Sequence, residues 1–232
     1  FSRIAPTLNG YGIMVMLGPE PGVAACNDKI AFYQKSLTAP ESTVLQTVTD
    51  IEQLRADHLV VKERYGSGSN NIGINLTRDE ARLHAATLAR PVFQPYLSGT
   101  EYSIDLYVDM QGSCRGVVAR TRDMVVHGES QVSTTVRHPQ LEEQCTALAR
   151  NLKLRGHLVF QAIEDEQGVV HFIECNCRFG GASTLAVAAG LDSFFWFFRE
   201  CAGEDSSQFA WNRPPGELRL VRSASDHFFE VG

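Results

Sequence analysis

The sequence has no apolar run long enough to cross a bilayer. A membrane-spanning helix needs about 20 largely apolar residues, and the most hydrophobic patch, "FFWFF" at 194–198, is far shorter. We predict that this patch belongs to a buried helix rather than to a membrane anchor. No membrane partner is therefore expected.

Cysteine is sparse and scattered. The six cysteines stand at positions 26, 114, 145, 175, 177 and 201, which does not resemble the dense spacing of a small disulfide-bonded scaffold. Because no signal-peptide pattern is found either, we expect reduced thiols and a cytoplasmic protein. The chain begins with Phe1 rather than Met, and we expect a further segment upstream of it.

An excess of positive charge is also missing. Lysine and arginine number 21 against 27 aspartates and glutamates, which gives a formal net charge of −6. Duplex nucleic acid requires a basic face, so nucleic acid is not an expected partner. The chain has 232 residues, of which 44% are hydrophobic and 21% charged. This composition and length are typical of one large globular domain or two small ones.

Local patterns in the first half of the chain predict a strand and capped helices. "YGIMVMLGPEP" (11–21) is typical of a short buried strand that ends in a turn. Asp28 is suited to cap a helix that follows it. Two later helices are predicted from capping-box pairs, Thr49 with Glu52 and Thr77 with Glu80.

The second half of the chain predicts strands that arrive as hairpins. In "EYSIDLYV" (101–108) apolar and mostly polar residues alternate, so one face of the strand is apolar. That face comprises Tyr102, Ile104, Leu106 and Val108. Hairpins favour an α+β class, with antiparallel sheet and helices on one side. The turn "FQPYLSG" (93–99) is the expected boundary between two parts.

The stretch "FIECNCRFGG" (172–181) places two cysteines beside an acid, an amide and an arginine. Successive side chains of a strand point to opposite faces. One face would hold Glu174, Asn176 and Arg178, and the other Cys175 and Cys177. A structural zinc site usually takes four ligands, and the sequence offers no second pair of cysteines or histidines at a suitable spacing. We therefore expect the cysteines to be core residues.

The polar face of this strand suggests a site for a hard metal ion. If the preceding strand, "HLVFQAI" (157–163), forms a hairpin with it, Gln161 lies across from Glu174. Oxygen ligands of this kind suit Mg²⁺, and Arg178 beside them suits an oxyanion. A solvated polar sheet face with an ion pair would explain the pattern equally well.

A glycine- and serine-rich loop, "VVKERYGSGSNN" (60–71), is a second candidate feature. Its small residues would let the backbone approach an anion, and Lys62 precedes them at the end of an apolar strand. The order differs from a Walker A loop, in which lysine follows the glycines. It indicates a hairpin flap over phosphates, although a plain turn fits the loop alone equally well. Flap and metal ligands together are parts of a phosphoryl-transfer site.

The order of these motifs resembles the ATP-grasp superfamily, most closely its carbamoyl-phosphate synthase large-chain-like branch of carboxylate–amine ligases. The resemblance extends over about residues 11–230 and depends on "NDK", "VVKERYGSGS", "FQPYLSGTEYSID", "GHLVFQ" and "FIECNCRFGG". The last motif is similar to the family's Glu-x-Asn-Pro-Arg signature, with Cys177 in place of proline. Because Cys177 is expected to face the core, we expect the geometry to persist.

The resemblance implies an ATP-grasp fold, in which two α+β lobes with antiparallel sheets sandwich ATP. Residues 1–18 would be the C-terminal remnant of a preATP-grasp domain, including a last strand near 11–17. Residues 19–92 would form the N-terminal lobe with the phosphate flap, and 93–232 the C-terminal lobe with the metal site. The implied cofactors are ATP and Mg²⁺ or Mn²⁺.

The resemblance also implies roles for single residues. The ATP phosphates would be held by Lys29 and Lys62, beneath Gly66, Ser67, Gly68 and Ser69. Adenine would contact Gln94 and Tyr96, the latter through its backbone, and the ribose hydroxyls would contact Glu101. The metal would be ligated by Gln161, Glu174 and Asn176, and catalysis would depend on Arg178 and Lys62. His127 falls near a substrate-proximal loop of the family, although a surface histidine would fit equally well.

The activity that the resemblance implies is that of an ATP-dependent ligase. Such an enzyme activates a carboxylate as an acyl phosphate and joins it to an amine, so its partners would be small carboxylates and amines. A homodimer is left open. The alternatives are a non-catalytic ATP-binding module that regulates a partner, and a metal-dependent hydrolase, which would leave the lysine-bearing flap unexplained. The sequence does not identify the substrate pair.

Overall fold

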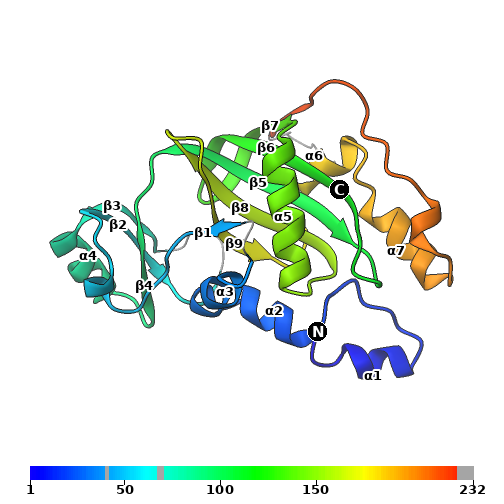
Figure 1. Ribbon diagram of the computed structural model, residues 1–232, viewed down its shortest axis with the longest axis horizontal. Coiled ribbons are helices and arrows are strands. Elements are labelled where there is room, and N and C mark those ends of the chain that lie inside the picture. Colours follow the sequence, from blue (N-terminus) through cyan, green and yellow to red (C-terminus); the bar gives the residue numbers. More distant parts are fainter. Residues whose placement is uncertain (40–41, 67–70, 224–232) are drawn as a thin grey trace, which may run out of the picture.

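The computed structural model describes residues 1–39, 42–66 and 71–223. These residues form a seven-stranded sheet and a three-stranded sheet. Figure 1 shows the small sheet at one end of the molecule and the large sheet in the middle. The large sheet contains, in spatial order, β1 (Thr43–Val44), β9 (Val170–Asn176), β8 (Gly156–Asp165), β5 (Gly99–Val108), β6 (Cys114–Val126), β7 (Glu129–Val136) and β10 (Arg219–Val221).

Neighbouring strands of the large sheet run antiparallel, except that β1 pairs parallel with β9. The predicted apolar face of β5 is confirmed, because all four of its residues are at most 8% exposed. Helix α5 (Pro139–Asn151) covers this face with Leu141, Cys145 and Leu148, all fully buried. Cys145 is thus a core residue.

Helices lie on both faces of the large sheet, and the expectation of helices on one side was wrong (Figure 1). On the second face α6 (Ser183–Ala188) and α7 (Ser193–Cys201) pack near Tyr107, whose ring stacks on Trp196 at 5.7 Å. Tyr107 of β5 and Val118 of β6 make part of this otherwise polar face apolar, and the helices pack there. The short helix η2 (Ser206–Gln208) follows.

The "FFWFF" patch forms most of α7, but only one side of this helix is buried. Trp196 and Phe197 are 3% and 9% exposed, whereas Phe194, Phe195 and Phe198 remain 46%, 38% and 64% exposed. The predicted buried helix is therefore amphipathic. Among the described residues no helix combines the length and apolarity that crossing a membrane would take.

The small sheet consists of β3 (Gly73–Thr77), β2 (His58–Glu63) and β4 (Pro91–Pro95), in that order, with both pairs antiparallel. Helix α4 (Arg78–Ala85) packs on it through Ala81, against a core that includes Leu59, Val61 and Phe93. The predicted capping box is confirmed, because Thr77 and Glu80 exchange side-chain and backbone hydrogen bonds.

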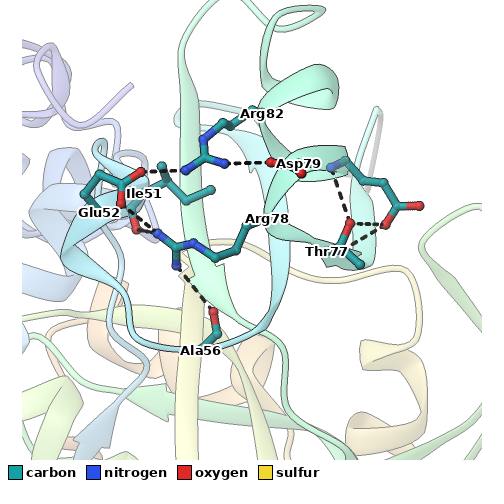
Figure 2. A network of polar contacts seen from close by, with 8 residues as sticks. Ile51, Glu52, Ala56, Thr77, Arg78, Asp79 and Arg82 are labelled. Atoms are coloured by element: carbon teal, nitrogen blue, oxygen red, sulfur yellow. Dashed lines mark hydrogen bonds and ion pairs between the residues drawn. The ribbon is translucent and has the colours of Figure 1, made fainter.

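Two arginines of α4 attach the loop that enters β2 (Figure 2). Arg78 donates to the carbonyl oxygens of Ile51 and Leu54, at 3.1 and 3.0 Å, and both Arg78 and Arg82 pair with Glu52. The predicted capping box of Thr49 and Glu52 was therefore wrong. Asp50 instead caps a single 3-10 turn, η1 (Ile51–Gln53).

The predicted strand at 11–21 was also wrong. Helix α1 (Ala5–Gly10) precedes a segment without strand pairing, and α2 (Glu20–Cys26) follows it. Tyr11 and Ile13 are 79% and 52% exposed, while only Met16 and Leu17 pack against the core. In the described part of the chain no strand pairs with this segment, so its apolar residues do not become a sheet. A preATP-grasp remnant at 1–18 has no strand to support it.

Candidate functional site

A cleft with a volume of about 1110 Å³ is lined by residues of both sheets. It contains every predicted site residue that the structure describes: Lys29, Lys62, Gly66, Gln94, Tyr96, Glu101, Gln161, Glu174, Asn176 and Arg178. His127 lines it as well. Ser67, Gly68 and Ser69 lie outside the described residues. Residues from distant parts of the sequence thus meet in one place.

The floor of the cleft is formed by β8 and β9, where the predicted register is confirmed. Gln161 pairs directly with Glu174, and Nδ2 of Asn176 donates to Oε1 of Glu174 at 3.2 Å. Cys175 and Cys177 point the other way and are 2% and 9% exposed. The alternation of the strand therefore separates a polar row from buried thiols.

This polar row offers only oxygen atoms to a metal ion. Glu174 supplies a carboxylate and Gln161 a side-chain carbonyl, and because Asn176 uses its NH₂ group on Glu174, it offers its carbonyl oxygen. Mg²⁺ prefers such hard ligands and takes further ones from water and phosphates. The three residues therefore fit Mg²⁺ or Mn²⁺.

Lys29 stands at the first position of α3 (Lys29–Ser36) and connects this helix to the loop after β2. Its Nζ donates to the carbonyl oxygen of Gly66 at 3.0 Å, and the residue is 8% exposed. Asp28 caps α3 and pairs with Arg64 at 2.6 Å. Burial opposes ionisation of Asp28, but the hydrogen bonds from Arg64 and the helix backbone outweigh it and lower its pKa.

Lys62 lies on β2 and is 9% exposed. Burial lowers its pKa to about 8, and neighbouring Lys29 adds to this effect, while Glu174 opposes it. The charges of Lys29 and Glu174 therefore both act on Lys62. A buried ammonium in this position is suited to bind an anion, because the anion would replace its lost hydration.

Arg178 lies in the segment that leaves β9 and lines the same cleft. Its Nη1 donates to the carbonyl oxygen of Phe179 at 3.1 Å. The ring of Phe179 stacks on buried His157 with centroids 3.9 Å apart. The acid, the amide and the guanidinium predicted from the sequence thus border one space.

Gln94 and Tyr96 lie where β4 ends and the chain passes to β5. Gln94 is 1% exposed and donates from Nε2 to Oγ1 of Thr47 at 2.8 Å. The backbone N–H of Tyr96 donates to the carbonyl oxygen of His58 at 2.9 Å. A backbone contact of Tyr96 with a ligand would therefore use its carbonyl oxygen.

Glu101 is held by an arginine that the sequence analysis missed. Its Oε2 lies 3.2 Å from Nε of Arg122, whose side chain is 9% exposed against 54% for Glu101. Burial lowers the pKa of Arg122, and Glu101 counteracts this. Strand β6 continues to Val126, so the alternation of Arg120 and Arg122 in "ARTRD" was the signal for two arginines lining the cleft.

A buried network behind the cleft was missed too. Asp105 is fully buried, pairs with Arg120 at 2.9 Å, and contacts His157 at 3.2 Å. Ser183 donates to Asp105 and accepts from the backbone N–H of Gly180 at 2.8 Å. Burial opposes ionisation of Asp105, but Arg120, His157 and Ser183 outweigh it and keep its pKa low. The network fixes the loop that follows Arg178.

Solved structures share this architecture at low sequence identity. The biotin carboxylase domain of Hydrogenobacter thermophilus 2-oxoglutarate carboxylase, in complex with MgADP, ADP and bicarbonate, is 17% identical, with a TM-score of 0.75 over 94% of this chain and 55% of that one. Campylobacter jejuni biotin carboxylase is 12% identical, with a TM-score of 0.74 and the same coverage of both chains. An L-amino acid ligase from Bacillus licheniformis is 16% identical, with a TM-score of 0.59 over 79% of this chain and 49% of that one.

The chain spans about half the length of the solved structures it matches first, at 55% of each. No curated protein matches its sequence. The sequence model of the family described as "ATP-grasp in the biosynthetic pathway with Ter operon" matches residues 88–222, which is more than half of the chain. The two lobes and the cleft between their sheets agree with that match, and the chain belongs to this ATP-grasp family.

Proposed function

We propose that this chain is the ATP-binding core of a ligase that activates a carboxylate as an acyl phosphate and joins it to an amine. The observation that carries the proposal is the meeting of two lysines, an arginine and a row of oxygen ligands in one cleft. Phosphoryl transfer needs charge neutralisation and positioning more than a protein nucleophile. These residue types supply both.

In the proposed reaction a carboxylate oxygen of the substrate attacks the γ-phosphorus of ATP, and the bond to the β–γ bridging oxygen breaks. ADP leaves, and the amine then attacks the acyl carbon and displaces inorganic phosphate. The amine nitrogen gives up its proton to the phosphate or to solvent. Atoms and charges balance without an oxidant or a covalent enzyme intermediate.

The predicted site residues that line the cleft each have a part in this reaction. Lys29 and Lys62 bind phosphate oxygens, and Arg178 steadies the phosphoryl group during transfer. Gln161, Glu174 and Asn176 would hold the divalent ion, which neutralises phosphate charge when bound. Gln94 and Tyr96 would bind adenine, and Glu101, oriented by Arg122, the ribose hydroxyls.

Two features of the similar structures support the choice of ligands. The Hydrogenobacter thermophilus structure holds MgADP together with bicarbonate, a small carboxylate-type anion. The Bacillus licheniformis protein is named as an L-amino acid ligase. A domain dimer is described for the former, and a homodimer is part of the proposal for this chain.

Two measurements test the proposal. The first is calorimetric titration of the chain with ATP in the presence and absence of Mg²⁺, for which we expect Mg²⁺-dependent binding at one site. The second is ADP release by the whole protein over a panel of carboxylates and amines, for which we expect turnover only with a matched pair. Mg²⁺-dependent binding without ADP release on any pair would favour the regulatory ATP-binding module instead.

A further inference from the structure

A cluster of three thiols lies on the side of β9 opposite the cleft. The Sγ atoms of Cys26, Cys175 and Cys177 are all within 4.8 Å of one another. The residues are 8%, 2% and 9% exposed. Cys26 comes from the end of α2, about 150 residues before the other two, so the sequence spacing gave no sign of a third thiol.

We propose that Cys26, Cys175 and Cys177 form a binding site for one soft, thiophilic metal ion such as Cu(I) or Cd²⁺. Three sulfurs at about 2.3 Å from a common ion lie about 4 Å apart, so a small inward movement of the side chains is sufficient. Thiolate sulfur selects soft ions, whereas Mg²⁺ takes oxygen ligands. The alternation of β9 therefore separates a hard site on one face from a soft site on the other.

Three sulfurs without a fourth ligand favour a soft ion over structural zinc. Structural zinc takes four protein ligands, and of the described residues the cluster unites only these three. The three cysteines belong to an apolar core with Val23, Phe32 and Phe172. An apolar shell excludes water as a fourth ligand and strengthens the preference for an ion that is coordinated by three sulfurs.

The cluster lies next to residues of the proposed ATP site. Cys175 lies between Glu174 and Asn176 in the strand, and Cys177 is followed directly by Arg178. Cys26 is close in sequence to Asp28 and Lys29, where α3 begins. Figure 1 shows α2 and α3 beside β9, and both contact this strand. A bound ion would hold α2 against β9 from behind the cleft.

Titration of the full chain with Cd²⁺ alone, in a phosphine reductant, tests this inference. We expect one equivalent to bind, with a thiolate-to-cadmium charge-transfer band in the ultraviolet and a release of protons from the thiols. Excess Mg²⁺ should not reduce the band. Cys26→Ser should lose the band and the rise in melting temperature that Cd²⁺ gives the wild type.

Matched variants keep the test specific. Cys201→Ser, at an exposed cysteine outside the cluster, should bind Cd²⁺ as the wild type does, and so should Glu174→Gln at the oxygen site. Circular dichroism checks that the variants fold, and Cys26→Ala replaces the serine variant if that one does not. No thiolate band in the wild type, or a band that survives in Cys26→Ala, would overturn the inference. Neither result would affect the proposed ligase.

Discussion

The side-chain amide of Asn176 donates to Oε1 of Glu174 over 3.2 Å, two residues apart on one face of β9. This bond uses the NH₂ group of the amide and leaves its carbonyl oxygen beside the carboxylate. Gln161 completes the row from the neighbouring strand. The hydrogen bond thus orders two of the three proposed metal ligands.

Asn176→Ala should weaken Mg²⁺-dependent ATP binding by about 10- to 100-fold, the range found when a group that orders a metal site is lost. The measurement is a calorimetric titration with Mg²⁺ at a fixed ATP concentration. Gln167→Ala is the matched control, because Gln167 is an exposed amide in the turn between β8 and β9. Equal Mg²⁺ dependence in both variants would contradict a ligand role for Asn176.

Lys62→Met should lower ATP affinity by about 10- to 100-fold, because a hydrogen bond to a charged group contributes about 1.5–3 kcal/mol. Methionine keeps most of the buried apolar stem, so the fold should persist. Lys153→Met, at an exposed lysine, should bind ATP as the wild type does. If Lys62→Met binds ATP with unchanged affinity, Lys62 does not contact the phosphates.

Binding of ATP should take up protons near pH 8. The pKa of Lys62 in the free protein is about 8, and the phosphates would raise it, so ATP affinity should fall as the pH rises through 8. Titrations in buffers of different ionisation enthalpy measure the uptake. Lys62→Met should abolish it, and an uptake that persists in this variant would assign it to another group.

The lowered pKa of Lys62 also predicts how the stability of the fold depends on pH. Its folded pKa of about 8 lies below the ordinary 10.5, so the unfolded chain binds the proton more tightly between these values. The contribution of Lys62 to the free energy of unfolding should therefore rise with pH from 8 to 10.5. Urea denaturation of wild type and Lys62→Met across this window tests it; parallel pH profiles would contradict it.

Ser183→Ala should destabilise the fold by about 1–3 kcal/mol, because it leaves buried Asp105 and the N–H of Gly180 with fewer partners. The loop after Arg178 would also lose an attachment, so ADP release should fall more than ATP affinity. Urea denaturation gives the first effect and kinetics the second. Ser207→Ala, at an exposed serine, should change neither, and unchanged kinetics in Ser183→Ala would leave the network structural only.

Strand alternation predicted the two faces of β9 correctly because it is a local property. The opposite faces of Glu174 and Cys175 follow from a period of two residues, and the pairing of Gln161 with Glu174 follows from the hairpin turn. The capping box at Thr77 is likewise encoded within four residues. Local signals of this kind needed no tertiary information.

The failures depend on partners distant in sequence. Glu52 does not form the expected capping box with Thr49, because its carboxylate pairs with Arg78 and Arg82 of α4. The segment at 11–21 had the composition of a strand but pairs with none in the described residues. Cys26 lies against Cys175 of β9 and Cys177, the residue after Asn176, and Arg122 reaches Glu101 from the neighbouring strand β6. No periodicity within the sequence marks such contacts.

The most direct test of the ligase account is Mg²⁺-dependent ATP binding by Glu174→Gln. This change keeps the size of the side chain and removes its charge, and Glu166→Gln in the exposed turn of the same hairpin is the control. We predict that Glu174→Gln loses the Mg²⁺ dependence and that Glu166→Gln retains it. Wild-type Mg²⁺ dependence in Glu174→Gln would contradict the central claim that this carboxylate holds the metal.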